Sequence, residues 1–142
     1  MIVQDILAGK GSSVVTITPD ATIADLIAVL AEHRIGAIVV SADGDTIAGI
    51  VSERDIARGL HAHGSDLLSL AVDAVMTTEV RTCGPQDDIS EIASIMTRGR
   101  FRHLPVVVDG SLVGIVSIGD VVKKRIDQLE TETDQLRDYL TS

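Results

Sequence analysis

The sequence predicts an α/β (α+β) fold of two related halves, each a small sheet with helices packed on it. Three observations predict it: a segment that occurs twice, apolar residues at helical spacing in each copy, and short aliphatic runs on either side of Asp-Gly pairs. Apolar residues make up 45% of the 142 residues, but aromatic residues only 1%. We therefore expect an aliphatic core between sheets and helices.

The repeat is visible directly in the chain. Pro85 aligns with Pro19 at an offset of 66, with matches on both sides. After one residue is dropped, Gly-Ile-Val-Ser-x-x-Asp at 49–55 aligns with the same pattern at 114–120. Matches of this kind indicate two copies of one unit of roughly 45 residues.

Each copy predicts a strand, a helix, two strands joined by a hairpin, and a second helix. The first strands are expected at 14–17 and 80–83, each followed closely by a Pro. Apolar residues at i, i+3, i+4 and i+7 from Ile23 and Ile89 predict amphipathic helices.

The later strands surround the Asp-Gly turns at 43–44 and 109–110, where glycine supplies the positive φ. They are expected at 37–40, 47–51, 104–108 and 112–116, and the second helices begin at Ser52 and Ser117. A unit this small exposes much apolar surface, so we expect the copies to pack about a pseudo-twofold axis, with a cleft between them.

The chain divides into 1–66 (first repeat with its N-terminal segment and linker), 67–125 (second repeat) and a helical tail, 126–142. In the tail, Ile126, Leu129, Thr133, Leu136 and Leu140 follow at spacings of three and four. The apolar stripe is too narrow for a helix that stands alone. It predicts packing on the body or on a second subunit.

Composition excludes several classes of function. The net charge of −9 argues against nucleic-acid binding, which needs a basic surface. Cys83 is the only cysteine, so neither an internal disulfide nor a Cys-rich zinc site is expected, and His61 and His63 lack further ligands. Without a signal peptide or a membrane-length apolar run, a cytoplasmic protein is expected.

The repeated Ser-x-x-Asp places a hydroxyl at a helix N-terminus and a carboxylate in the first turn. Unpaired N–H groups there favour an anion such as phosphate, and the carboxylate can accept both hydroxyls of a ribose. The same pattern is also a plain capping arrangement. Both interpretations remain open.

Arg98, Arg100, Arg102 and His103 concentrate positive charge in an acidic chain. Beside a cleft, such charge suits a phosphate or pyrophosphate; at a helix C-terminus, it would merely complement the dipole. The first copy has Gly36 and Ala37 in place of Arg102 and His103, so two sites would differ. No nucleophile and base stand at motif spacing, so no catalytic residues are predicted.

The sequence resembles the cystathionine-β-synthase (CBS) domain family in its paired form, the Bateman module. The resemblance rests on Val75-Met76-Thr77, on 100–106 (Arg-Phe-Arg-His-Leu-Pro-Val) and on both Gly-Ile-Val-Ser-x-x-Asp segments. The segments from Ser52 and Ser117 look like a stand-alone bacterial subgroup that consists only of such a pair. The resemblance implies a regulatory module that dimerises, and a protein partner that responds to it.

It also implies binding of an adenine nucleotide between the repeats, AMP or NAD(H) foremost, with ATP, ADP or S-adenosylmethionine as further candidates. By similarity, one site would use Ser52, Arg54 and Asp55, completed by Met76, Thr77, Thr78, Arg102 and His103. The other would use Ser117 and Asp120, completed by Ser12, Ser13, Val14, Ile35 and Gly36. The competing hypotheses are a structural dimer whose Ser-x-x-Asp segments only cap helices, and an enzyme that turns over a nucleotide.

Overall fold

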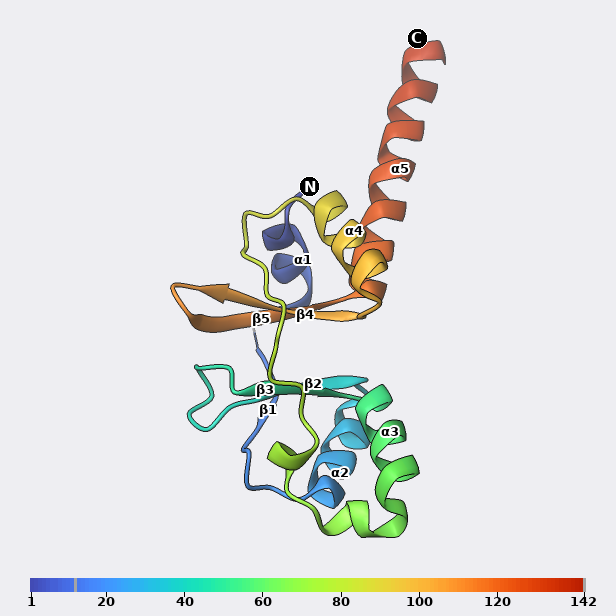
Figure 1. Cartoon of the computed structure of the whole chain (residues 1–142). Coiled ribbons are helices and arrows are strands. Elements are labelled where there is room, and N and C mark those ends of the chain that lie inside the picture. The colour runs from blue at the N-terminus through green and yellow to red at the C-terminus, as the bar shows by residue number, and fades with distance from the viewer. Residues whose placement is uncertain (12, 142) are drawn as a thin grey trace.

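The computed structural model describes residues 1–11 and 13–141 and consists of two similar halves (Figure 1). The first half contains β1 (Thr16–Ile17), α2 (Ile23–His33), β2 (Ala37–Val40), β3 (Gly49–Ser52) and α3 (Glu53–His63). The second half contains α4 (Ile89–Gly99), β4 (His103–Val108), β5 (Ser111–Ser117) and the start of α5 (Ile118–Thr141). Both sheets lie in the middle of the molecule, with helices on the outer sides (Figure 1). The predicted α/β class is confirmed.

The two hairpins have the same register. Strand β1 pairs in parallel with β2, β2 pairs antiparallel with β3, and β4 pairs antiparallel with β5. Ser52 lies opposite Ala37, and Ser117 lies opposite His103. Each serine is therefore the last residue of its strand, directly before a helix.

The strand predicted at residues 80–83 is wrong. In this segment Cys83 alone makes a bridge, parallel to Val106, and residues 80–82 are irregular. Pro105 explains the difference, because it takes the place that Val39 has in the first half and has no N–H to donate to a neighbouring strand. The segment stays close to the sheet through Cys83, whose N–H donates to the Pro105 carbonyl (3.0 Å).

The two Asp-Gly turns differ in length. Asp109 (φ 51°) and Gly110 (φ 81°) form a two-residue hairpin between Val108 and Ser111, as predicted. The connection containing Asp43 and Gly44 is longer, because β2 ends at Val40 and β3 begins only at Gly49. In this loop, the Asp43 carboxylate accepts hydrogen bonds from the N–H groups of Asp45 and Thr46.

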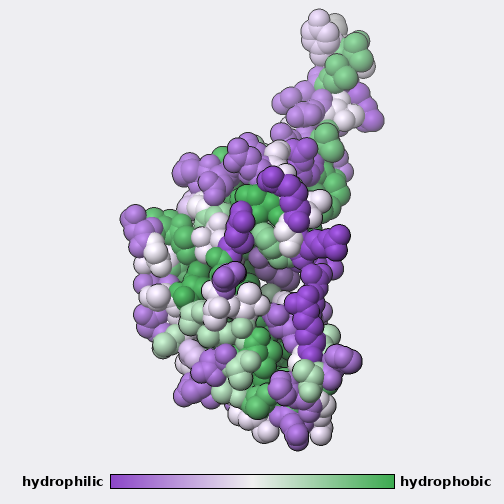
Figure 2. All heavy atoms as spheres, in the orientation of Figure 1, coloured by the Kyte–Doolittle hydropathy of each residue, from purple (hydrophilic) through white to green (hydrophobic). Residues whose placement is uncertain are grey.

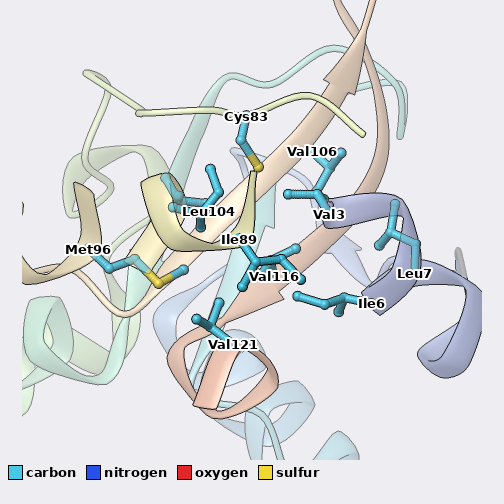
Figure 3. Close-up of a cluster of buried hydrophobic side chains, with 11 residues drawn as sticks. Val3, Ile6, Leu7, Cys83, Ile89, Met96, Leu104, Val106, Val116 and Val121 are labelled. Atoms are coloured by element: carbon cyan, nitrogen blue, oxygen red, sulfur yellow. The ribbon is translucent and has the colours of Figure 1, made fainter. Parts of the chain in front are cut away.

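Each half is completed by a segment that precedes the other half in the chain. Helix α1 (Val3–Lys10) comes before the first repeat, yet its apolar residues belong to the core of the second half (Figure 3). The linker before the second half packs in the opposite sense. Its two short 3₁₀ helices, η1 (Gly64–Ser69) and η2 (Val72–Ala74), contribute Leu67 and Val72 to the core of the first half. The chain thus crosses between the halves twice, and residues 77–81 run past the gap between them.

Equivalent hydrogen bonds anchor these segments. Val3 N–H donates to the Asp87 carbonyl (2.9 Å), and Val72 N–H donates to the Ala21 carbonyl (2.8 Å). The helix predicted at 126–140 is present, as the outer part of α5.

Candidate functional site

The repeated Ser-x-x-Asp segments cap the helices that follow them. Ser52 N–H donates to Asp55 Oδ2 (2.9 Å), and Asp55 N–H donates to Ser52 Oγ (3.4 Å). In the second half, Ser117 N–H donates to Asp120 Oδ2 (2.9 Å), and Asp120 N–H donates to Ser117 Oγ (3.2 Å). The capping interpretation therefore holds for both copies.

Capping uses only one oxygen of the Asp55 carboxylate. The other oxygen, Oδ1, accepts a hydrogen bond from Thr77 Oγ1 (3.3 Å), across to the crossing segment. Ser52, Asp55 and Thr77 also line a cavity of about 750 Å³ between the two halves. The capping motif and the cavity thus share residues, so the two interpretations of the sequence are compatible.

The cavity brings together eight of the fifteen residues predicted for binding. These are Gly36, Ser52, Arg54, Asp55, Thr77, Arg102, His103 and Ser117. They come from both predicted sites, because Gly36 and Ser117 were expected in the second one. One continuous cavity between β2, β3, α3 and the loop before β4 therefore contains parts of both.

The other predicted residues do not line this cavity. Met76 packs against the core of the first half, as does Ile35. The remaining described ones are Ser13, Val14, Thr78 and Asp120. Ser12 lies outside the described residues.

The cavity is basic although the chain is acidic. Its walls carry five arginines, at positions 54, 58, 81, 100 and 102. Three acidic residues also line it: Glu53, Asp55 and Glu79. The formal balance is thus positive in a chain of net charge −9. Such a local excess of guanidinium groups favours an anionic ligand with several oxygens, since each guanidinium can donate two parallel hydrogen bonds.

Two of these arginines were missed by the sequence analysis. Arg58 lies one helical turn after Arg54 on α3, so spacing of four from a predicted site residue was an available signal. Arg81 had no such signal, because it lies on the crossing segment that was expected to be a strand.

Backbone conformation at Arg100 brings the basic segment to the cavity. Arg100 is the C-cap of α4 and has a left-handed conformation (φ 56°), which turns the chain from the helix toward β4. Its carbonyl accepts a hydrogen bond from Arg54 Nη1 (2.8 Å), so α3 of one half holds the loop of the other. The arginines of both halves therefore meet at one place.

His103 lies where the two hairpins come close together. A Cβ added to Gly36 would be 3.6 Å from His103 Cε1, an ordinary van der Waals distance, so Gly36 and the imidazole are direct neighbours. Burial lowers the pKa of His103, and the nearby charges of Lys10 and Arg102 lower it further. The ring is therefore neutral at pH 7 and gains a proton most readily when an anion binds beside it.

The second carboxylate of the repeated pattern is paired within the chain. Lys10 Nζ, at the end of α1, lies 2.6 Å from Asp120 Oδ2. Burial alone would raise the pKa of Asp120, but the hydrogen bonds from Lys10 and from the Ser117 N–H lower it below its ordinary value. The equivalent Asp55 accepts a hydrogen bond from the hydroxyl of Thr77 on its other oxygen, Oδ1, so the two halves present different chemistry.

Cys83 belongs to the core of the second half (Figure 3). Burial raises the pKa of its thiol to about 12, so it stays protonated. The described part of the chain has no group of three or more His, Cys, Asp or Glu side chains that could hold a metal ion. Among the described residues, no helix combines the length and apolar composition needed to cross a membrane.

Comparison with known proteins identifies the class. The CBS domain family matches residues 3–62 and 72–127, so the chain belongs to this family and carries two CBS domains in tandem. Tandem CBS pairs are, as a class, regulatory modules. The resemblance stated from the sequence is confirmed.

Individual relatives match most of the chain. The chain is similar to the mitochondrial CBS domain-containing protein CBSX3 of Arabidopsis thaliana, with 33% identity over 97% of this chain and 71% of that protein. The solved structure of the CBS-domain protein ATU1752 from Agrobacterium tumefaciens has 44% identity and a TM-score of 0.85, over 88% of this chain and 99% of that one. The CBS pair of protein MJ0100 shares the fold, with a TM-score of 0.77 at 24% identity over 87% and 98% of the two chains.

Proposed function

We propose that this CBS pair is a sensor that binds an adenine nucleotide in the cavity between its halves and has no catalysis of its own. The observation that carries the proposal is the set of five arginines around a cavity that is also lined by Asp55, a carboxylate that caps α3. AMP and NAD(H) are the foremost candidates, followed by ATP, ADP and S-adenosylmethionine.

The phosphate part of the ligand is expected among the arginines. Arg54, Arg100 and Arg102 approach the cavity from both halves, so a phosphate there would bridge the halves through charge-assisted hydrogen bonds. Ser52 at the N-terminus of α3 adds a hydroxyl and the positive end of the helix dipole. A ligand without a phosphate, such as S-adenosylmethionine, would use fewer of these groups.

The ribose is expected at Asp55. Within the described part of the chain, the one hydrogen-bond partner of its Oδ1 is the hydroxyl of Thr77, at 3.3 Å, and two ribose hydroxyls would replace or join that weak bond. The MJ0100 structure supports an adenosine-containing ligand, because that CBS pair was solved in complex with 5′-methylthioadenosine and S-adenosyl-L-methionine.

A regulatory role follows from the position of the cavity between two packed halves. A ligand that contacts both halves stabilises one arrangement of them over others, and a second copy or a partner protein would respond to that shift. Among the described residues, His103 has no hydrogen-bonded serine or cysteine that would act as a nucleophile. The arrangement therefore favours binding over turnover.

The capping aspartates offer a matched test. Asp55 caps α3 and lines the cavity, whereas Asp25 forms the same capping box with Thr22 on α2 away from it. Asp55→Ala and Asp25→Ala should each lower the free energy of unfolding by about 1 kcal/mol. Isothermal titration calorimetry with the six adenine compounds (AMP, ADP, ATP, NAD, NADH and S-adenosylmethionine) should show binding to the wild type and at least a tenfold loss in Asp55→Ala alone.

Each alternative predicts a different result. If the module is only structural, the wild type gives no binding heat with any compound, and the two variants differ in nothing but stability. If the ligand lies elsewhere, Asp55→Ala and Asp25→Ala bind equally well. Appearance of a hydrolysis product during the titration would contradict the proposed absence of catalysis.

A further inference from the structure

Helix α5 extends beyond the body of the molecule (Figure 1), and exposed apolar residues lie on its outer part (Figure 2). It has 24 residues, about 36 Å at 1.5 Å per residue, yet Val121 is its only buried residue. All residues from 129 to 141 are exposed. Because most of the stability of such a helix comes from packing, the outer part of α5 is expected to pack against something outside its own chain.

The exposed face follows a heptad pattern. Spacings of four and three alternate through six residues, which we call the seam: Val122, Ile126, Leu129, Thr133, Leu136 and Leu140. The five apolar members are between 50% and 72% exposed. Thr133 donates its hydroxyl to the Leu129 carbonyl (2.9 Å), which satisfies the polar group within the helix and leaves the methyl group for packing.

We propose that α5 pairs with α5 of a second copy of this chain as a parallel, in-register, two-stranded coiled coil along the seam. In heptad terms, Ile126, Thr133 and Leu140 take position a, and Val122, Leu129 and Leu136 take position d. Two of the three residues at position a, Ile126 and Thr133, are β-branched, and Leu occupies two of the three d positions. This combination favours parallel dimers.

The flanking charges specify the parallel orientation. In a parallel pair, position g of one helix faces position e of the next heptad on the other helix. Arg125 (g) then faces Glu130 (e) of the second copy, and Glu132 (g) faces Arg137 (e) of the second copy. By symmetry each pair occurs twice, so all four contacts join opposite charges.

An antiparallel pair would bring like charges together. Aligning the apolar layers, with Ile126 opposite Leu136 of the second copy, places e against e and g against g. Glu130 then faces Glu130, and Glu132 faces Glu132. Lys123 in turn faces Arg137. The charges thus favour one orientation and oppose the other.

In the residues that the structure describes, no ion pair neutralises these flanking charges. Among the described residues, the one ion pair is Lys10–Asp120, away from the seam. Arg125 donates one hydrogen bond to Ser90 Oγ (2.8 Å) and has further N–H groups for a second partner. The seam also continues into a depression of about 480 Å³ at the base of α5, with Ile118, Gly119, Val122 and Ile126 among its lining residues. A second helix along the seam would cover this depression as well.

Sedimentation equilibrium of the full-length chain tests the pairing. We expect a dimer for the wild type and at least a tenfold weaker one for Leu136→Ser. Gln135→Ser, one residue away and off the seam, carries the same helix-propensity change and should leave the dimer unchanged. A monomeric wild type, or equal dimerisation of both variants, would overturn the proposal.

Disulfide trapping tests the orientation. In a parallel pair the two 136 positions adjoin, so Leu136→Cys should form a linked dimer under mild oxidation, while Gln135→Cys should not. An antiparallel pair separates the two 136 positions by about 15 Å, ten residues along the axis, and gives no link. Failure of Leu136→Cys to link, or equal linking of both variants, contradicts the parallel coiled coil.

Discussion

Gly49 and Gly114 begin the two repeated segments because another part of the chain lies directly against each of them. A Cβ on Gly49 would be 2.7 Å from Met76 Sδ and 2.8 Å from the Thr77 carbonyl oxygen. A Cβ on Gly114 would be 2.6 Å from a methyl group of Leu7. The glycines therefore allow the exchanged segments to pack onto the sheets, and in the first half this contact also positions Thr77 beside Asp55.

This close approach predicts opposite effects for two glycine substitutions. Gly49→Ala should lower the free energy of unfolding by about 1–3 kcal/mol, because a backbone carbonyl must move. Gly9→Ala, in α1 with nothing within 4 Å of the added Cβ, should be neutral or stabilising by up to about 1 kcal/mol. Urea unfolding measures both values, and equal stabilities of the two variants would contradict the packing described here.

His103 predicts a pH dependence of ligand binding. Burial chiefly, and nearby positive charge as well, hold the pKa of His103 below its ordinary value, whereas a bound phosphate would raise it. Binding then takes up a proton, so affinity should rise as the pH falls from 8 to 6. The phosphate itself also titrates near pH 6, so the affinity ratio of wild type to His103→Gln, measured by calorimetry across this range, isolates the imidazole. A ratio that does not change with pH would place the phosphate away from His103.

At the scale of elements, the sequence predicted the helices of the two repeats and the tight hairpin because their signals are local, whereas α1 and the short helices of the linker were not predicted. Apolar spacing located α2 and α4, and Asp109-Gly110 located the tight turn. The strand at 80–83 failed for a non-local reason, since its pairing depends on Pro105 in another strand. Strand formation is decided by the neighbouring strand as much as by the residues themselves.

The candidate site shows the same division between local and tertiary signals. Ser52, Asp55, Arg102 and His103 were recognisable from motifs and line the cavity. Arg81 was not, because its position depends on how the chain crosses from one half to the other. The Lys10–Asp120 pair was also invisible in the sequence, since it joins residues 110 positions apart.

For the whole molecule, duplication predicted two halves with a cleft between them, and the structure has both. Duplication did not predict that α1 packs in the core of the second half, or that the linker packs in the core of the first half. The sequence also suggested two sites of unequal chemistry, whereas the described residues form one basic cavity and, at Asp120, a carboxylate that Lys10 already neutralises. Because α1 brings Lys10 to Asp120, whereas Asp55 accepts a hydrogen bond from Thr77, the two halves are chemically unequal.

The central claim is that the basic cavity between the halves is the place where ligand binds. The measurement that tests it most directly is a two-dimensional amide NMR titration of the ¹⁵N-labelled wild type with AMP, which reports binding and location together. Shifts should concentrate at four cavity segments, namely Gly36, 52–55, 77–81 and 100–103, and leave 129–141 unchanged. No shifts at millimolar AMP, or shifts centred on Lys10 and Asp120 instead, would contradict the account.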